Sequence, residues 1–305
     1  MILFDIAADN HLTVIREKPF KYEKAEIQQL FEKNLQAITG LEMVKSEFPI
    51  KNKRIDTLAF DPQNKAFVII EYKRERNTSV FDQGITYLNL LLQNREAFLV
   101  EYNESLDRHL KRADVDWTQS RVIFVAPDFT ENQIEATNFK DLSIDLWKVR
   151  RYENKTLAVT PIIKSKTAES FKHFAGSNPG EALKTVIQEI RTYTEEDLLK
   201  GKPEKTAELY ARFREAILNL TDDIEVKPQK HYVAFKKEGR NIADIEIQSS
   251  TLKLFINLKQ GALDDPKQLT RDISQIGHHG NGDYGIKISD DKHLEYIMSL
   301  VKQAL

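Results

Sequence analysis

The chain has 305 residues, enough for about two domains of ordinary size. Its 45 basic and 47 acidic residues give a net charge of -2, which excludes a global attraction to phosphate backbones and confines any nucleic-acid site to a local patch. The absence of cysteine excludes disulfides, thiolate metal sites and cysteine nucleophiles. We recognise no secretory leader and no membrane-spanning run, so we expect a soluble cytoplasmic protein.

The first half of the chain alternates helical and strand-like patterns. Apolar residues recur at helical spacing over residues 21–39, and Gly40 ends the pattern, which predicts an amphipathic helix. Thr78 or Ser79 is placed to cap a later helix. The predicted strands are 43–50, 53–60, 65–73, 121–127 and 141–151, and the further predicted helices are 80–94 and 131–138. The order αβββαβαβ over residues 1–163 predicts an α/β domain.

The composition of the chain changes after residue 163. Residues 164–182 are rich in small, polar and turn-forming types, so we predict a linker over 164–205 that includes a helical segment. After an amphipathic helix, the pattern then alternates apolar and polar residues, as half-buried antiparallel strands do. The predicted strands are 232–237, 242–248, 251–259 and 285–289, and a closing helix follows them. Residues 206–305 are therefore predicted to form a smaller α+β domain with an antiparallel sheet.

Two consecutive strand-like runs carry acidic residues near their ends. If they form a hairpin with Phe60 opposite Phe67, Asp56 falls directly opposite Glu71. Opposed carboxylates repel unless a cation neutralises them, and such oxygen ligands suit Mg²⁺ or Mn²⁺. Lys73 lies on the same face, where it is placed to orient a water or to offset charge on a phosphorane-like transition state. The alternative is an ion pair between Asp56 and Lys73 with a solvated Glu71.

The next predicted helix carries a second polar pair. Gln83 and Tyr87 are four residues apart and therefore lie on one helical face, from which both can reach one phosphate or base. The alternative is that Tyr87 packs in the core while Gln83 faces solvent. The pair gains weight as a functional feature because it follows the two carboxylates.

The segments RIDTLAFD, VIIEYKR and DQGITYL, preceded by a helix with LFEKNL, resemble the PD-(D/E)XK nuclease superfamily, especially its RecB-like and endonuclease branches. The resemblance covers about residues 20–150 and implies a restriction-endonuclease-like αβββαβ core with a mixed sheet. It also implies that Asp56 and Glu71 are metal ligands and that Lys73 is the catalytic lysine. Gln83 and Tyr87 would then be the supporting helix pair.

The same resemblance involves two further positions. Glu32 matches a first-helix glutamate that some of these enzymes place near the metal, and its alternative role is a solvated helix glutamate. Ile55 stands where the motif name has proline, but many relatives lack that proline.

Basic residues surround the two strand ends. Between Lys45 and Arg76 the chain has eight Lys or Arg and five Asp or Glu, which suits a local contact with phosphates. The alternative is a solvated, charged rim of the sheet. The candidate phosphate contacts are Lys51, Lys53, Arg54, Arg74 and Arg76.

The last hundred residues resemble an uncharacterised C-terminal domain family whose members are labelled predicted transport proteins, through HYVAFKK, TLKLFINLK, DDPKQLTRD and GHHGNGDYG. No segment there is long and apolar enough to cross a membrane, so the label receives no support. We interpret His278 and His279 as part of a structural loop, because the surrounding Gly-Asn-Gly-Asp composition is typical of turns. We treat the domain as a binding or specificity module, through which a homodimer or a protein partner would assemble.

The leading hypothesis is a metal-dependent nuclease that hydrolyses phosphodiester bonds in DNA, with RNA as the less favoured substrate, in restriction, repair or defence. The alternative is a non-catalytic nucleic-acid or protein binding module on a nuclease-like fold, which the near-neutral charge favours. The joint presence of Asp56, Glu71 and Lys73 argues against that alternative. In a third interpretation the chain is an interaction protein whose polar residues are incidental.

Overall fold

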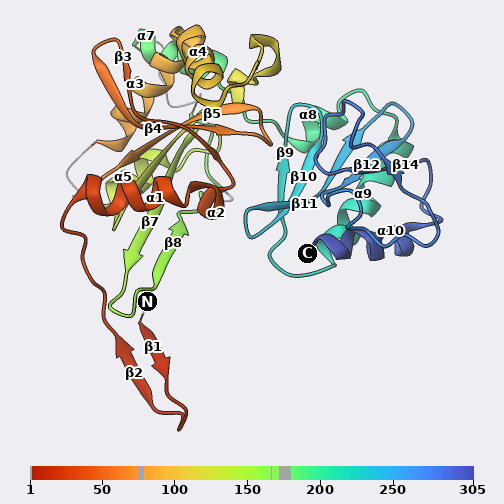
Figure 1. Cartoon of the computed structure of the whole chain (residues 1–305). Helices are drawn as coiled ribbons and strands as arrows, with labels where there is room; N and C mark the ends of the chain where they lie inside the picture. Colours follow the sequence, from red (N-terminus) through yellow and green to blue (C-terminus); the bar gives the residue numbers. More distant parts are fainter. Residues whose placement is uncertain (1, 75–78, 166, 172–179) are drawn as a thin grey trace. The chain divides into compact units, whose positions relative to one another are not determined.

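The structure is a computed structural model that describes residues 2–74, 79–165, 167–171 and 180–305. The chain divides into two compact units, Met1–Arg191 and Thr192–Leu305, each with its own sheet and hydrophobic core (Figure 1). The division falls inside the segment 164–205 that the sequence predicts as a linker. No helix within the described ranges combines the length and apolarity that a bilayer crossing requires.

The first unit is built on a six-stranded mixed sheet in the order β3-β4-β5-β6-β7-β8. The first three strands form an antiparallel meander, β6 and β7 run parallel to β5, and β8 pairs antiparallel with β7. The strands are β3 (Glu42–Ile50), β4 (Lys53–Asp61), β5 (Ala66–Tyr72), β6 (Arg121–Ala126), β7 (Ile144–Arg151) and β8 (Leu157–Pro161). The predicted α/β class and mixed sheet are confirmed, whereas β8 was not predicted.

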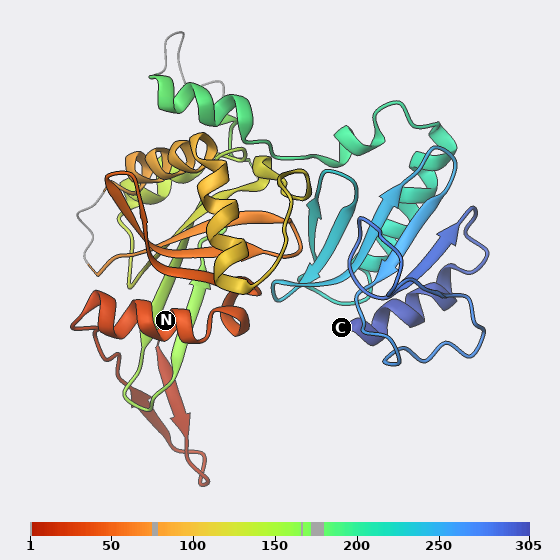
Figure 2. The same cartoon turned by 45° about the horizontal axis from the view of Figure 1, so that its top comes forward.

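Helices cover both faces of this sheet, as Figures 1 and 2 show. On one face lie η1 (Glu23–Gln28), α1 (Gln29–Lys33) and α2 (Leu35–Thr39). The other face carries α3 (Val80–Gln93), α4 (Arg95–Leu106), α5 (Glu131–Thr137) and α7 (Glu181–Glu189). The short 3-10 segments η2 (Arg112–Asp114) and η3 (Trp117–Gln119) precede β6.

The single helix predicted over residues 21–39 is interrupted. Its first part, η1, is π-helical, and a break at Asn34, whose φ is -120°, separates α1 from α2. The side chain of Asn34 donates to the carbonyl of Leu30 at 2.8 Å, which competes with regular helix geometry. Gly40 ends α2 in the left-handed conformation, as predicted.

Besides β8, the hairpin of β1 (Leu3–Ile6) and β2 (Leu12–Ile15) and the helix α4 of the first unit were not predicted. The hairpin forms a separate two-stranded sheet. Its apolar side chains are exposed, so its sequence does not show the alternation of buried and exposed residues from which a strand is predicted. In α4 only Phe98 and Tyr102 are buried, which leaves no long apolar stripe.

Strand β5 is buried along its whole length because helices cover both of its faces. Its residues alternate between two core layers: Phe67 and Ile69 pack in the layer that contains α3, and Val68 and Ile70 pack in the layer that contains α1. Glu71 continues the first series, so this alternation directs it toward α3.

Helix α3 lies close to the sheet at Gly84. A Cβ at this position would lie 2.9 Å from Cγ1 of Ile144 in β7 and 3.4 Å from Cε2 of Phe124 in β6. A larger residue would therefore move the helix or its neighbours.

The second unit contains a six-stranded antiparallel sheet in the order β13-β14-β12-β11-β10-β9. Its strands are β9 (Glu225–Pro228), β10 (Val233–Lys237), β11 (Arg240–Ile247), β12 (Leu252–Ile256), β13 (Arg271–Asp272) and β14 (Tyr284–Ile288). The helices are α8 (Glu195–Leu199), α9 (Glu204–Leu218), α10 (Leu294–Val301) and the 3-10 segment η4 (Lys302–Ala304). The predicted antiparallel sheet is confirmed, and the edge strands β9 and β13 were not predicted.

The GHHGNGD segment packs against this sheet. Asn281 donates from its main-chain N–H at 2.6 Å and from Nδ2 at 2.8 Å to the carboxylate of Asp244, whose burial raises its pKa to about 7. The ring nitrogens of His278 lie 2.6 Å from the Ile276 carbonyl oxygen and 3.1 Å from that of Gly282. His279 instead stacks on His231, with ring centroids 4.1 Å apart. The two adjacent histidines therefore have different surroundings.

We expect Gly282→Ala to reduce the free energy of unfolding by roughly 3 kcal/mol, because it combines backbone strain with overpacking. Gly282 has a φ of +86°, and a Cβ there would lie 2.6 Å from the Cα of Asn257. Gly261 has the same φ but open space around it, so Gly261→Ala is a matched control that should cost about 1–2 kcal/mol. Urea denaturation measures both changes, and equal losses would show that packing at Gly282 is unimportant.

Candidate functional site

The β4–β5 hairpin brings Asp56 and Glu71 together. Its register places Phe60 opposite Phe67, as predicted, and continues toward the two acidic residues. The main-chain N–H of Asp56 donates to Glu71 Oε1 at 3.2 Å, and that of Tyr72 donates to Asp56 Oδ2 at 3.1 Å. Each carboxylate is therefore held by a main-chain N–H of the opposite strand.

Glu71 is buried and Asp56 is half-buried, with little compensating charge around them. Glu71 is 2% exposed. Its pKa is raised to about 7, mainly by burial and to a smaller extent by the nearby Asp56 carboxylate. Burial also raises the pKa of Asp56, against the opposing effects of the Tyr72 N–H and the Lys73 charge. Lys73 Nζ lies 3.4 Å from Glu71 Oε2. The alternative of a solvated Glu71 is therefore wrong.

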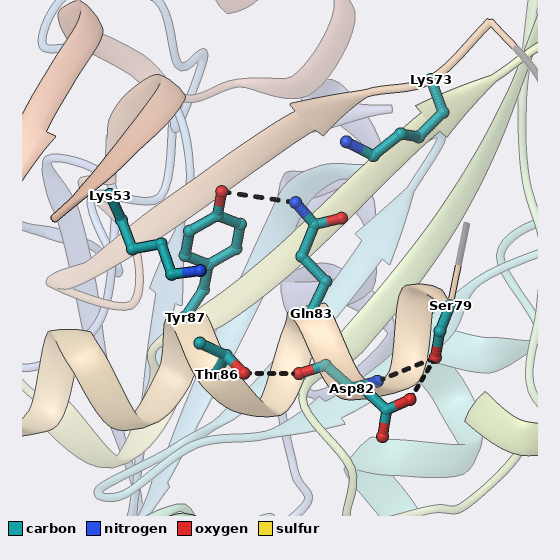
Figure 3. Close-up of a pocket in the computed structure, with 7 residues that line it drawn as sticks. All are labelled: Lys53, Lys73, Ser79, Asp82, Gln83, Thr86 and Tyr87. Carbon is teal, nitrogen blue, oxygen red and sulfur yellow. Dashed lines mark hydrogen bonds between the residues drawn. The ribbon is translucent and has the colours of Figure 1, made fainter.

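The Gln83 and Tyr87 pair reaches the same carboxylate. Gln83 Nε2 donates to Glu71 Oε2 at 3.1 Å and to the Tyr87 hydroxyl at 3.3 Å, and the second of these bonds is drawn in Figure 3. The Tyr87 hydroxyl in turn donates to the Arg54 carbonyl at 3.4 Å. Helix α3 begins at Val80 because Ser79 accepts a bond from the Asp82 N–H. The alternative of a solvent-facing Gln83 is wrong, although Tyr87 is also part of the core.

Glu32 lies on the α1 side of β4, where its Oε1 accepts bonds from Thr57 at 2.5 Å and from Ser46 at 2.9 Å. Gln28 Nε2 lies 3.0 Å from Glu32 Oε1 and 3.0 Å from the Asp56 carbonyl oxygen. No bond among the described residues joins Glu32 to either carboxylate of the pair. The structure thus connects Glu32 to the main chain around Asp56, and its role in catalysis stays a prediction.

Gln28 and Thr57 were not predicted from the sequence as residues of the site. Gln28 is buried although it is polar, and it precedes Glu32 by four residues, which places both on one helical face. Thr57 directly follows Asp56 and is fully buried. A buried polar position beside a candidate ligand is the signal that could have found them.

The predicted phosphate contacts differ in their surroundings. Lys51 and Lys53 are exposed at the β3–β4 turn. The Arg54 guanidinium pairs with Glu47 at 2.8 Å, and the Arg74 guanidinium donates to the Lys21 carbonyl at 3.0 Å. Arg76, the remaining predicted phosphate contact, lies outside the described residues.

An open pocket of about 370 Å³ lies beside the pair. It is lined by Lys53, Lys73 and polar side chains of the first turns of α3, including Gln83, as Figure 3 shows. We call it the α3 pocket. Because Lys73 and Gln83 both bond to Glu71 Oε2, the pocket adjoins the carboxylate pair.

The donor set suits a divalent cation that takes few protein ligands. Two carboxylates with raised pKa values, one buried and one half-buried, lack a full counter-charge, which a cation would supply. Across the described parts of the chain, no group of three His, Cys, Asp or Glu side chains is placed to hold a metal ion. Mg²⁺ commonly uses one or two carboxylates and completes its coordination with water and substrate oxygens. Asp56 and Glu71 therefore fit this role.

Comparison with known proteins identifies a relative of nearly the same length. The chain is 54% identical over 294 residues to a protein of Haemophilus influenzae whose description is "uncharacterized protein", and 96% of each chain is covered. Residues 195–305 match a family described as a domain of unknown function, DUF5655.

Three solved structures are similar to part of the chain. A repair endonuclease from Pyrococcus abyssi matches with 20% identity and a TM-score of 0.24, covering 42% of this chain and 47% of that one. EndoMS in a complex with double-stranded DNA matches with 18% identity and a TM-score of 0.25, covering 45% and 51%. SfsA of Pyrococcus furiosus with Ca²⁺ matches with 13% identity and a TM-score of 0.26, covering 49% and 76%. At these values the matches carry no argument about activity.

Proposed function

We propose that this chain, which belongs to one family with the uncharacterised Haemophilus influenzae protein, is a divalent-cation-dependent nuclease. The observation that carries the proposal is the pairing of the half-buried Asp56 with the buried Glu71, whose carboxylate is bonded by both Lys73 and Gln83. The proposed substrate is DNA, and RNA is the alternative that the same assay decides.

Asp56 and Glu71 would hold Mg²⁺ or Mn²⁺. When bound, the cation would supply Lewis acidity and neutralise charge on the phosphodiester. Lys73 orients the attacking water and offsets the charge that builds on the phosphoryl oxygens, because its ammonium group lies at the edge of the pair. Gln83 fixes the orientation of Glu71, and Tyr87 fixes Gln83 by joining it to the main chain of β4. These roles together supply cation binding, orientation of the attacking water and stabilisation of the charge that develops during phosphodiester hydrolysis.

The test compares cleavage of single-stranded DNA, duplex DNA and RNA by the wild-type protein and by Asp56→Asn, each with Mg²⁺, Mn²⁺ or EDTA. We expect cleavage that requires a cation and is lost in Asp56→Asn, because the variant lacks one ligand charge. Glu42→Gln serves as a matched control, since this carboxylate lies at the start of β3 and pairs with Arg108.

Calorimetry with Mn²⁺ on the same samples makes a negative result informative. Cation binding that depends on Asp56 would support the ligand assignment even before the correct substrate is found. If the wild-type protein neither binds a cation nor cuts any polymer, the catalytic proposal fails and a binding module remains.

A further inference from the structure

The α3 pocket has the features of an anion site. In Figure 3, Lys53 and Lys73 enter it from different sides, and both ammonium groups are directed toward the Gln83 and Tyr87 pair. Lys73 is paired with Glu71. The side chain of Lys53 makes no ion pair or hydrogen bond within the part of the chain that the structure describes, and it is exposed. One ammonium group in the pocket is thus engaged by the carboxylate pair, and the other is free to bind a ligand.

Other groups of the pocket define its polarity. The buried Oε1 of Gln83 has no hydrogen-bond partner among the described residues, but as an acceptor it does not contribute to binding an ionised phosphate. The Asp82 carboxylate, which would repel an anion, is bonded to the Ser79 hydroxyl at 2.5 Å. The Tyr87 ring is only 5% exposed and so offers no face on which a nucleobase could stack. The pocket is therefore better suited to a charged group than to a base.

We propose that the α3 pocket binds the phosphate next to the scissile one in the same strand, with Lys53 as its contact. The inference rests on the proposed nuclease function, because the adjoining carboxylate pair defines where the scissile phosphate lies. The substrate would then be a polynucleotide with at least two consecutive phosphodiester linkages. A small diester with a single phosphate would leave the pocket empty and would bind weakly.

The first experiment neutralises one phosphate at a time. Oligonucleotides that carry a single methylphosphonate at successive linkages are cut by the wild-type protein and by Lys53→Ala. We expect one neighbouring linkage whose neutralisation raises KM about tenfold for the wild type, as for a lost hydrogen bond to a charged group. The same change should have no further effect on Lys53→Ala, and kcat should change little in either protein.

Two results would overturn the assignment once oligonucleotides with a single abasic nucleotide are added to this series. One is that no linkage shows an effect that depends on Lys53. The other is that an abasic nucleotide, and not a methylphosphonate, produces the Lys53-dependent loss, which would make the pocket a base site.

The second experiment needs no cleavage and therefore separates this inference from the proposed function. In EDTA and in an Asp56→Asn background, oligonucleotide affinity is measured by fluorescence anisotropy as a function of salt. Loss of one phosphate contact in Lys53→Ala should reduce the slope of log K against log salt by about 0.9 for duplex or about 0.7 for single strands. Lys65→Ala is the matched control, an exposed lysine at the opposite end of the β4–β5 hairpin. An unchanged slope in Lys53→Ala would overturn the inference even if the protein proves to be a nuclease.

Discussion

Replacement of Glu71 by glutamine is expected to stabilise the protein above pH 7 while removing cation binding and cleavage. Burial and the neighbouring Asp56 raise the pKa of Glu71 from 4.5 to about 7, so the folded state binds this proton more tightly than the unfolded state does. Stability from this group is therefore greatest at low pH and falls as the pH rises between these values. The loss reaches at most roughly 3 kcal/mol, and a neutral glutamine avoids it.

Urea denaturation in EDTA at pH 5 and pH 8 measures this effect. The difference in unfolding free energy between Glu71→Gln and wild type should be small at pH 5 and clearly positive at pH 8. Glu96→Gln is the control for removing a carboxylate, because Glu96 is exposed and paired with Arg112. A wild-type protein with the same pH dependence as Glu71→Gln would contradict the raised pKa. Added Mg²⁺ should raise the unfolding free energy of the wild type at pH 8, but it should not raise that of Glu71→Gln.

Lys73→Ala is expected to lower kcat by about 10²- to 10³-fold, the usual cost of removing one group that stabilises transition-state charge. Its affinity for Mn²⁺ should be retained, because Asp56 and Glu71 both remain and a competing positive charge is gone. Lys73→Arg should not restore activity fully, since a planar guanidinium differs in shape from an ammonium group. Single-turnover kinetics and calorimetry measure the two quantities. A rise in KM with an unchanged kcat would instead make Lys73 a binding residue.

The central part of the candidate site could be predicted because its residues are tied by local geometry. The short turn DPQN and the alternation of two strands determine the register that sets Asp56 beside Glu71. The spacing of four residues puts Gln83 and Tyr87 on one helical face. In each case the information lies within about twenty residues of sequence.

Other features depend on contacts between distant segments. Gln28 reaches the Asp56 carbonyl across 28 residues, and no local pattern encodes that bond. By contrast, the break at Asn34, whose side chain bonds to the Leu30 carbonyl, and strand β8, which pairs with β7 across a short turn, are local features that were nevertheless not predicted. The limits of the domains, and the roles of individual site residues, stay predictions.

The close packing at Gly84 connects the chemistry to a strand that contributes no residue to the carboxylate pair. Gly84 directly follows Gln83, and the missing side chain lets α3 rest near Ile144 of β7. The distance between the Gln83 amide and Glu71 thus depends on how closely this turn of α3 packs against β7. The absence of a side chain at Gly84 therefore helps to determine the position of the Gln83 amide relative to Glu71. A change in side-chain volume at Ile144 would be transmitted through the helix to the orientation of a carboxylate two strands away.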